Sequence, residues 1–151
     1  MSKDINGEKY LYRHIVAVFF HCHNDKNNES RQFMITTFVL SILDQWFLMT
    51  AGHCIDLIKD QINSGFKIVG CRLIDNLGLN AVHNEPIPFD LSNAKLFSLD
   101  DEKGFDYGLV PLDPHYVKLL EANKIRAITE KAWETEPPHV DFHLLLGIPI
   151  E

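Results

Sequence analysis

The stretch from Trp46 to Cys54 constrains the fold of this chain more than any other. It reads Trp46-Phe47-Leu48-Met49-Thr50-Ala51-Gly52-His53-Cys54, so large apolar residues are followed by small ones and then by a single histidine. A short apolar run of this kind predicts a buried strand. The small Ala51-Gly52 pair predicts a tight turn at the end of that strand, which would present the side chain of His53.

Other apolar runs predict a mostly β fold with two helices. A helix is predicted over residues 54–62, where apolar residues recur at helical spacing and Asn63-Ser64-Gly65 ends the pattern. A second is predicted over residues 115–124, because Asp113-Pro114 is an N-cap followed by proline at the first helical position. Strands of β-branched and aromatic residues are predicted over residues 14–20, 32–43, 46–49, 66–74, 93–99 and 107–112. About six strands are consistent with a small barrel.

A second motif follows at residues 104–112, which read Gly-Phe-Asp-Tyr-Gly-Leu-Val-Pro-Leu. Asp106 stands at the start of this apolar strand. Asp100 and Asp101 lie close by, but only Asp106 directly precedes the Tyr-Gly-Leu-Val-Pro-Leu run. Taken alone, Asp106 is typical of an ordinary turn aspartate, and His53 alone is typical of a histidine satisfied within a core. The two motifs in this order favour a joint role.

The two motifs together resemble those of trypsin-like serine peptidases. Residues 46–54 resemble the family segment W-[VIL]-[VIL]-T-A-[AG]-H-C, and residues 106–112 resemble D-[IYF]-[AG]-L-[LIV]-x-L. The resemblance implies that His53 is the general base and that Asp106 orients it. It also implies a six-stranded antiparallel β-barrel over residues 10–112, a linker with a helix over 113–139, and the first strand of an incomplete second barrel over 140–151.

The nucleophile of that family has no counterpart in the sequence. None of the six serines lies in a G-D-S-G-G or G-x-S-x-G motif. We therefore predict a trypsin-like serine endopeptidase domain that is cut short before its catalytic serine and inactive as this chain alone. The alternative is a non-catalytic, protease-like module that binds another protein. A polypeptide substrate or a protein partner is expected in either case.

The cysteines leave a further alternative open. In the family, the cysteine after the catalytic histidine usually bonds to one on the preceding strand, where this chain has Thr36-Thr37. Cys54 therefore lacks its usual partner, although Cys22 could replace it if the strands lie close enough. His21-Cys22-His23, with His83 or Cys54, could suggest a metal site, but adjacent side chains on a strand point to opposite faces. We predict neither a metal nor a cofactor.

Charge and hydropathy exclude two classes of partner. The chain has 14 basic and 21 acidic residues, a formal net charge of −7, and no basic cluster, which argues against nucleic acid. Its apolar runs are too short to span a membrane, and residues 1–10 lack an apolar signal-peptide core. Three cysteines in 151 residues do not form a disulfide scaffold. These features predict a cytoplasmic protein.

Overall fold

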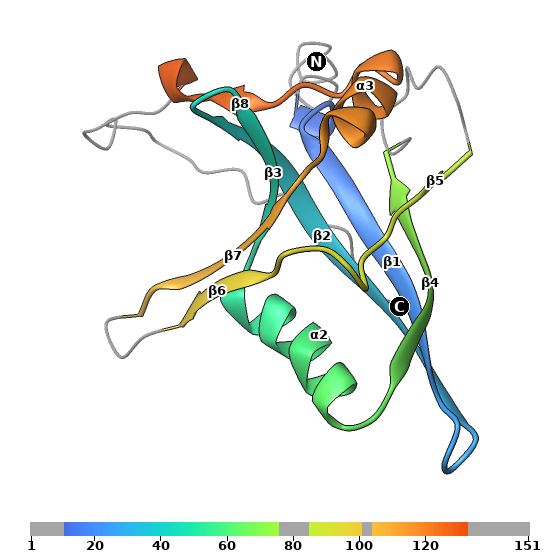
Figure 1. The fold of residues 1–151 in the computed structure, drawn as a ribbon. Helices are drawn as coiled ribbons and strands as arrows, with labels where there is room; N and C mark the ends of the chain where they lie inside the picture. The colour runs from blue at the N-terminus through green and yellow to red at the C-terminus, as the bar shows by residue number, and fades with distance from the viewer. Residues whose placement is uncertain (1–10, 76–84, 101–103, 133–151) are drawn as a thin grey trace, which may run out of the picture.

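The computed structural model describes residues 11–75, 85–100 and 104–132 (Figure 1). The described part is mostly β, as predicted, with two α-helices of two turns or more: α2 (Gly52–Asn63) and α3 (Pro114–Ala122). A short 3₁₀ helix, η1 (Glu130–Ala132), follows the last strand. The strands are β1 (Ile15–Asn24), β2 (Glu29–Ile42), β3 (Gln45–Thr50), β4 (Lys67–Ile74), β5 (Ile87–Pro88), β6 (Phe97–Asp100), β7 (Asp106–Pro111) and β8 (Ile128–Thr129).

These strands form one sheet with the order β5-β4-β1-β2-β3-β7-β6, and every pair along this path is antiparallel. The short strand β8 pairs with β2 in parallel, off the path. Strands β5 and β6 lie at opposite ends of the order, yet both belong to one continuous segment, residues 87–100. The sheet therefore curves so far that a single segment reaches both of its edges (Figure 1).

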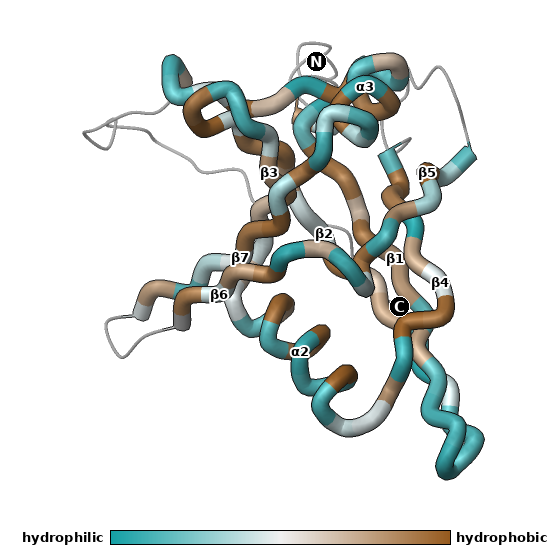
Figure 2. Tube along the Cα trace, viewed as in Figure 1, coloured by the Kyte–Doolittle hydropathy of each residue, from teal (hydrophilic) through white to brown (hydrophobic). Residues whose placement is uncertain are grey.

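The core lies on the concave side of this curved sheet. Alternate residues of β1 point inward, and Val16, Phe20 and Cys22 are fully buried there. Leu48 of β3 and Val110 of β7 join Val16 and Phe20 in one cluster of buried apolar residues. In Figure 2 the hydrophobic residues of α2 lie on the side of the helix that faces the strands. The side chains of Ile55 and Ile58, three residues apart, are the buried ones on that side.

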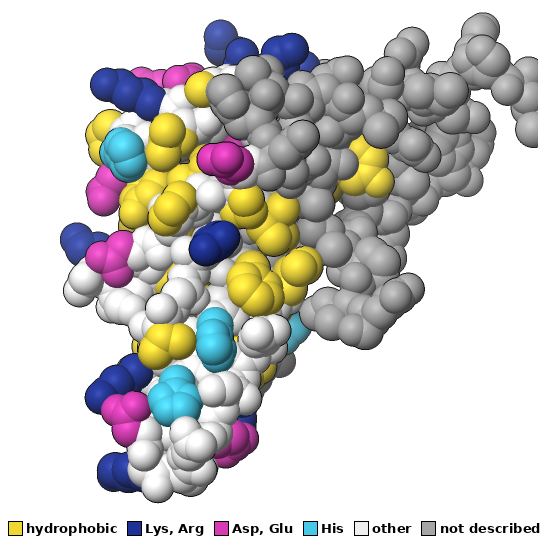
Figure 3. Space-filling view, turned by 90° about the vertical axis from the view of Figure 1, so that its right-hand side faces the viewer, with side chains coloured by type: hydrophobic (Ala, Val, Ile, Leu, Met, Phe, Trp, Pro, Cys, Tyr) yellow, Lys and Arg dark blue, Asp and Glu magenta, His cyan; other side chains and the backbone are white. Residues whose placement is uncertain are grey.

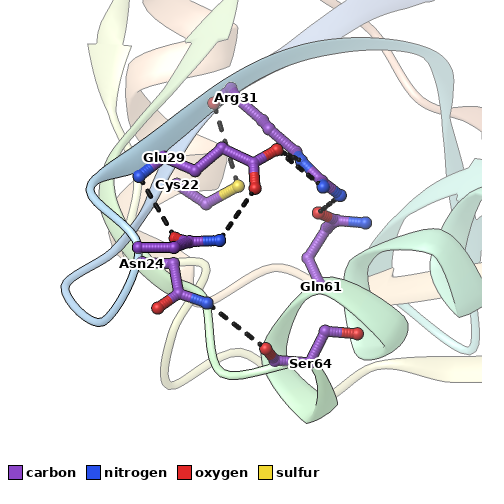
Figure 4. A network of polar contacts seen from close by, with 7 residues as sticks. Cys22, Asn24, Glu29, Arg31, Gln61 and Ser64 are labelled. Carbon is purple, nitrogen blue, oxygen red and sulfur yellow. Dashed lines mark hydrogen bonds and ion pairs between the residues drawn. The ribbon is translucent and has the colours of Figure 1, made fainter.

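The C-terminal end of α2 is tied to the β1–β2 hairpin by polar contacts (Figure 4). The Arg31 guanidinium donates a hydrogen bond of 3.0 Å to Gln61 Oε1 and pairs with Glu29 at 2.7 Å. The Asn24 side-chain amide donates to the backbone carbonyl of Ser64, at 3.4 Å. The helix ends at Asn63 with Ser64 as its C-cap, and Gly65 follows with a positive φ of 89°. These contacts fix the end of the helix that lies away from His53.

The structure corrects the sequence prediction at several places. Besides the six predicted strands, the described sheet includes the two-residue strands β5 and β8, so it has eight strands in all. Strand β1 continues to Asn24 and β2 begins at Glu29, so both strands extend further toward their shared turn than the predicted ranges 14–20 and 32–43. The predicted linker contains the predicted helix as α3, but it also contributes β8 to the sheet, and its Leu120 and Ile125 belong to the core. The strand predicted within 140–151 lies outside the described residues.

No described helix has the length and apolar character that a membrane crossing requires.

Candidate active site

Strand register brings His53 and Asp106 together. Strand β3 ends at Thr50, which pairs with Gly108 of β7, and Ala51 then turns the chain into α2. Asp106 precedes Gly108 by two residues, so it lies just beyond the end of β3, where α2 begins. Side chains two apart on a strand share a face, and Gly108 is on the buried face of β7. The Asp106 carboxylate consequently faces the first turn of the helix.

Asp106 makes two contacts with the same residue. Its Oδ2 atom lies 2.6 Å from His53 Nδ1, and its Oδ1 atom accepts a hydrogen bond of 2.8 Å from the His53 backbone N–H. A carboxylate can only accept, so His53 Nδ1 carries the proton of this contact and, in the neutral ring, Nε2 carries the lone pair. The pair thus fixes both the orientation and the tautomer of the imidazole.

The second contact also completes the helix. Ala51 is the N-cap of α2 and supplies no side-chain cap, and the first turn carries no acidic residue. Asp106 therefore takes the place of a capping residue from a different strand. The hydrogen bond from the His53 backbone N–H, followed by the bond from its ring, lowers the pKa of Asp106 below its ordinary value of 3.8, and partial desolvation opposes this shift. The carboxylate is therefore ionised across the neutral range.

Two glycines let the helix and the strand approach this closely. A Cβ atom on Gly52 would lie 2.8 Å from the Leu99 carbonyl oxygen and 2.9 Å from Asp106 Oδ1. A Cβ atom on Gly108 would lie 2.5 Å from Ile55 Cγ1 and 2.7 Å from the Ala51 carbonyl oxygen. All four separations are shorter than a Cβ atom can tolerate, so neither position accepts a larger residue without a shift. The small residue at position 52 is part of the predicted turn. The need for glycine at position 108 arises only from the packing of α2 against β7, which the sequence does not show.

A polar link on α2 holds the helix against β6. Ser98 Oγ donates to Asp56 Oδ1 at 2.7 Å, and Lys59 Nζ donates to Ser98 Oγ at 2.6 Å. Asp56 and Lys59 are one turn apart, so both face the same strand. Sequence analysis missed this link because none of its three residues belongs to a recognisable motif. It fixes the middle of the helix, while Asp106 fixes its start.

The outer nitrogen of His53 is open to solvent. The side chain of His53 is 70% exposed, against 38% for Asp106. Within the described residues, no side chain other than Asp106 hydrogen bonds to the ring of His53. Two described serine hydroxyls are engaged elsewhere, Ser30 with His23 and Ser98 with Asp56, and Ser2 lies outside the described residues. Among the described residues, His53 is therefore an oriented base to which no serine hydroxyl is hydrogen bonded.

The cysteines and histidines that the sequence left as alternatives form neither a disulfide nor a metal site within the described residues. Cys22, Cys54 and Cys71 are all free thiols, so Cys22 does not bond to Cys54. His23 Nδ1 contacts Ser30 Oγ at 2.8 Å. His83 lies outside the described residues. Across the described part of the chain, no three His, Cys, Asp or Glu side chains are grouped so as to hold a metal ion.

Comparison of the chain with models of protein families, with curated proteins and with solved structures found no match.

Proposed function

We propose that His53 and Asp106 are the general base and the orienting carboxylate of a trypsin-like serine endopeptidase. The observation that carries the proposal is the geometry of the pair: the 2.6 Å contact holds Nδ1, and Nε2 faces outward at a 70% exposed side chain. Such an arrangement suits a base that takes a proton from an approaching hydroxyl. The order along the chain, histidine before aspartate, agrees with the order in that family.

The sheet supports the same proposal. Six segments make up its continuous path, namely β1, β2, β3, β4, β7 and the segment 87–100 that carries both β5 and β6. Because that segment pairs with β4 at one edge and with β7 at the other, it links the two edges of the sheet. We infer a six-stranded antiparallel barrel of the trypsin type, to which the parallel strand β8 is an addition.

The proposed reaction needs a serine from outside residues 1–151. The serine oxygen would bond to the carbonyl carbon of a peptide while its proton passes to His53 Nε2, and the carbonyl π electrons would move onto oxygen. His53 would then donate that proton to the amine nitrogen as the C–N bond breaks, and water would release the acyl group by the same steps. Asp106 stays ionised throughout and stabilises the imidazolium. Residues 1–151 alone are expected to cleave nothing.

A second candidate function is a protease-like module that binds another protein. It is favoured by an apolar face beside the site, formed by the outer sides of β2, β3, β6 and β7. Phe97 and Leu99 are 54% and 50% exposed there, and a hollow of about 540 Å³ lies between the side chains. An exposed apolar patch of this kind is typical of a protein interface. The hollow is lined by Phe38, Leu40, Ile42, Met49, Phe97, Ser98, Leu99, Tyr107 and Leu109.

The three free thiols support a reducing compartment for either function. Burial raises the pKa of the Cys71 thiol to about 12 and also raises that of Cys22, so both stay protonated and inert. Free cysteines without disulfides are typical of the cytoplasm. We therefore propose a cytoplasmic location.

Labelling with a fluorophosphonate in the cells that make the protein tests the peptidase proposal. The reagent bonds covalently to an activated serine. It should label a serine outside residues 1–151, in a polypeptide that purifies together with this chain. None of the six serines of residues 1–151 should be labelled. The substitution His53→Ala should abolish the labelling. His115→Ala, at an exposed histidine of α3, is the matched control and should leave it unchanged.

The outcomes separate the two candidates. Labelling of a serine within residues 1–151, or labelling that survives His53→Ala, contradicts the peptidase proposal. Absence of any labelled serine, with a protein partner lost on Leu99→Asp, supports the binding module instead.

A further inference from the structure

A second cavity lies away from the candidate active site, on the outer face of β1, β2 and β4. Its volume is about 470 Å³, within the range of small-molecule sites. Figure 3 views the molecule from the side on which β4 and β5 lie in Figure 1. On this face a basic side chain is surrounded by hydrophobic ones, with two histidines below it. The cavity is lined by Phe19, His21, Met34, Gly70, Arg72, Ile74 and Pro86.

The outer face of a sheet in water normally carries polar residues. Here Phe19 and Met34 pair directly across β1 and β2, and both are partly buried although they face away from the core. Gly70 lies opposite His21 on β4, and a Cβ atom added to it would meet nothing within 4 Å. The glycine therefore leaves open space beside these two apolar side chains.

Two residues with polar side chains, His21 and Arg72, line this cavity. The Nε2 atom of His21 is buried and has no hydrogen-bond partner among the described residues, which is unfavourable unless a ligand satisfies it. Arg72 is exposed and makes no ion pair with any described residue. His21 pairs with Gly70 and Phe19 pairs with Arg72, so His21 and Arg72 are diagonal neighbours on one face. Such neighbours lie roughly 7–8 Å apart, within reach of a long side chain.

We propose that this cavity binds a small apolar monocarboxylic acid. The Arg72 guanidinium and the His21 imidazole take the carboxylate, because a guanidinium pairs with a carboxylate through two parallel N–H donors. The apolar part of the ligand lies over Gly70 against Phe19, Met34 and Ile74. An acid fits better than a neutral or cationic compound, because it satisfies the unpaired histidine nitrogen and the unpaired cation together. This site is independent of His53 and Asp106.

Decanoate, titrated into the full chain by calorimetry, tests the proposal, with 1-decanol as the neutral compound of equal chain length. Decanoate should bind and decanol should bind at least tenfold more weakly. Arg72→Gln should reduce the affinity for decanoate roughly tenfold, since a charge-assisted hydrogen bond is lost. Lys118→Gln removes the same charge from an exposed position on α3 outside the cavity and should change nothing.

Gly70→Leu gives a second, independent readout. The added side chain enters open space, so the variant should keep its unfolding temperature while losing decanoate binding. The imidazole signals of His21 should shift on adding decanoate to the wild type and stay fixed in this variant. Equal binding of decanoate and decanol, unaltered binding by Arg72→Gln, or no binding of decanoate would each overturn the proposal.

Discussion

The Asp106 carboxylate holds His53 at two points, the ring Nδ1 at 2.6 Å and the backbone N–H at 2.8 Å. One side chain therefore orients the imidazole and also caps the helix that carries it. The position of His53 cannot change without disturbing the start of α2, because both depend on the same two oxygens. Two hydrogen bonds thus hold His53 in place although its side chain is largely exposed.

Replacing Asp106 by asparagine should lower stability in a pH-dependent way. The pKa of Asp106 is lower in the folded protein than its ordinary 3.8, so between these values the unfolded state binds more protons. Its stabilising contribution is complete above pH 3.8 and is lost as the pH falls through the folded-state value. Thermal unfolding should show Asp106→Asn melting below the wild type at neutral pH, with the gap closing in acid.

Asp113→Asn is the matched control for that experiment. Asp113 is the N-cap of α3 but makes no side-chain capping hydrogen bond. Its replacement should therefore produce no gap that closes in acid. A constant difference between Asp106→Asn and the wild type at every pH would contradict the assignment of the ionised carboxylate as the cap.

Substituting Gly108 by alanine should destabilise the protein by about 1–3 kcal/mol, as overpacking in a core does. The new methyl group would overlap Ile55 Cγ1 and the Ala51 carbonyl and push α2 away from β7. Urea unfolding measures the loss. Gly70→Ala, on β4 with open space around it, should leave the stability unchanged or raise it by up to about 1 kcal/mol. Equal losses in both variants would show that packing against α2 is not the cause.

His14 should make stability fall in mildly acidic solution. Its Nδ1 atom donates to the Arg126 carbonyl at 2.7 Å, and its Nε2 atom accepts from Arg13 at 3.2 Å, so the ring is neutral. Burial chiefly lowers the pKa of His14 below its ordinary value of 6.5. The contribution of His14 to stability is present above pH 6.5. It is lost as the pH falls through the pKa of His14 in the folded protein, because the unfolded state binds the proton first.

His14→Asn isolates this effect from the other histidines. The asparagine amide retains a donor for the Arg126 carbonyl but does not titrate. The variant should lose about 1 kcal/mol at neutral pH, one hydrogen bond's worth, and the difference from the wild type should shrink below pH 6.5. Urea midpoints of the wild type and the variant, measured at neutral pH and below pH 6.5, check this prediction. If the two midpoints changed in parallel with pH, the assignment of a neutral His14 would be contradicted.

Alkylation of the native protein with iodoacetamide should modify Cys54 alone. Cys54 is partly exposed, whereas Cys22 and Cys71 are buried and have raised pKa values, so neither presents a thiolate. Mass spectrometry should find one adduct before unfolding and three after it. Cys54→Ser should give none before unfolding. Protection of Cys54 that a reductant relieves would instead indicate a disulfide.

Local patterns were sufficient for the longest elements of the fold. Apolar runs and helical spacing predicted the succession of β3, α2 and β4 to within about two residues at each boundary. The hairpin end of β1 was missed because residues 24–31 are polar throughout. Few apolar side chains mark the inward face of the strands there, and the turn depends on Asn28, whose φ is +55°. Strands β5 and β8 carry no local signal. Each has only two residues and forms a strand because β4 or β2, distant in the sequence, lies beside it.

The site divides in the same way. The apolar frames around His53 and Asp106 were enough to choose Asp106 over Asp100 and Asp101. The second contact, from Asp106 to the His53 backbone, depends on Thr50 pairing with Gly108, and a strand register between distant segments leaves no trace in either motif. The Asp56–Ser98–Lys59 link likewise requires the helix to lie on β6.

The segment that carries both β5 and β6 has a consequence for local opening. If residues 87–100 lift away from the sheet, the hydrogen-bonding edges of β4 and β7 become accessible at the same moment. Unpaired edges of this kind recruit strands from other molecules. We therefore expect detachment of this one connection to promote self-association through both edges, and amide hydrogen exchange on β4 and β7 would report the same event.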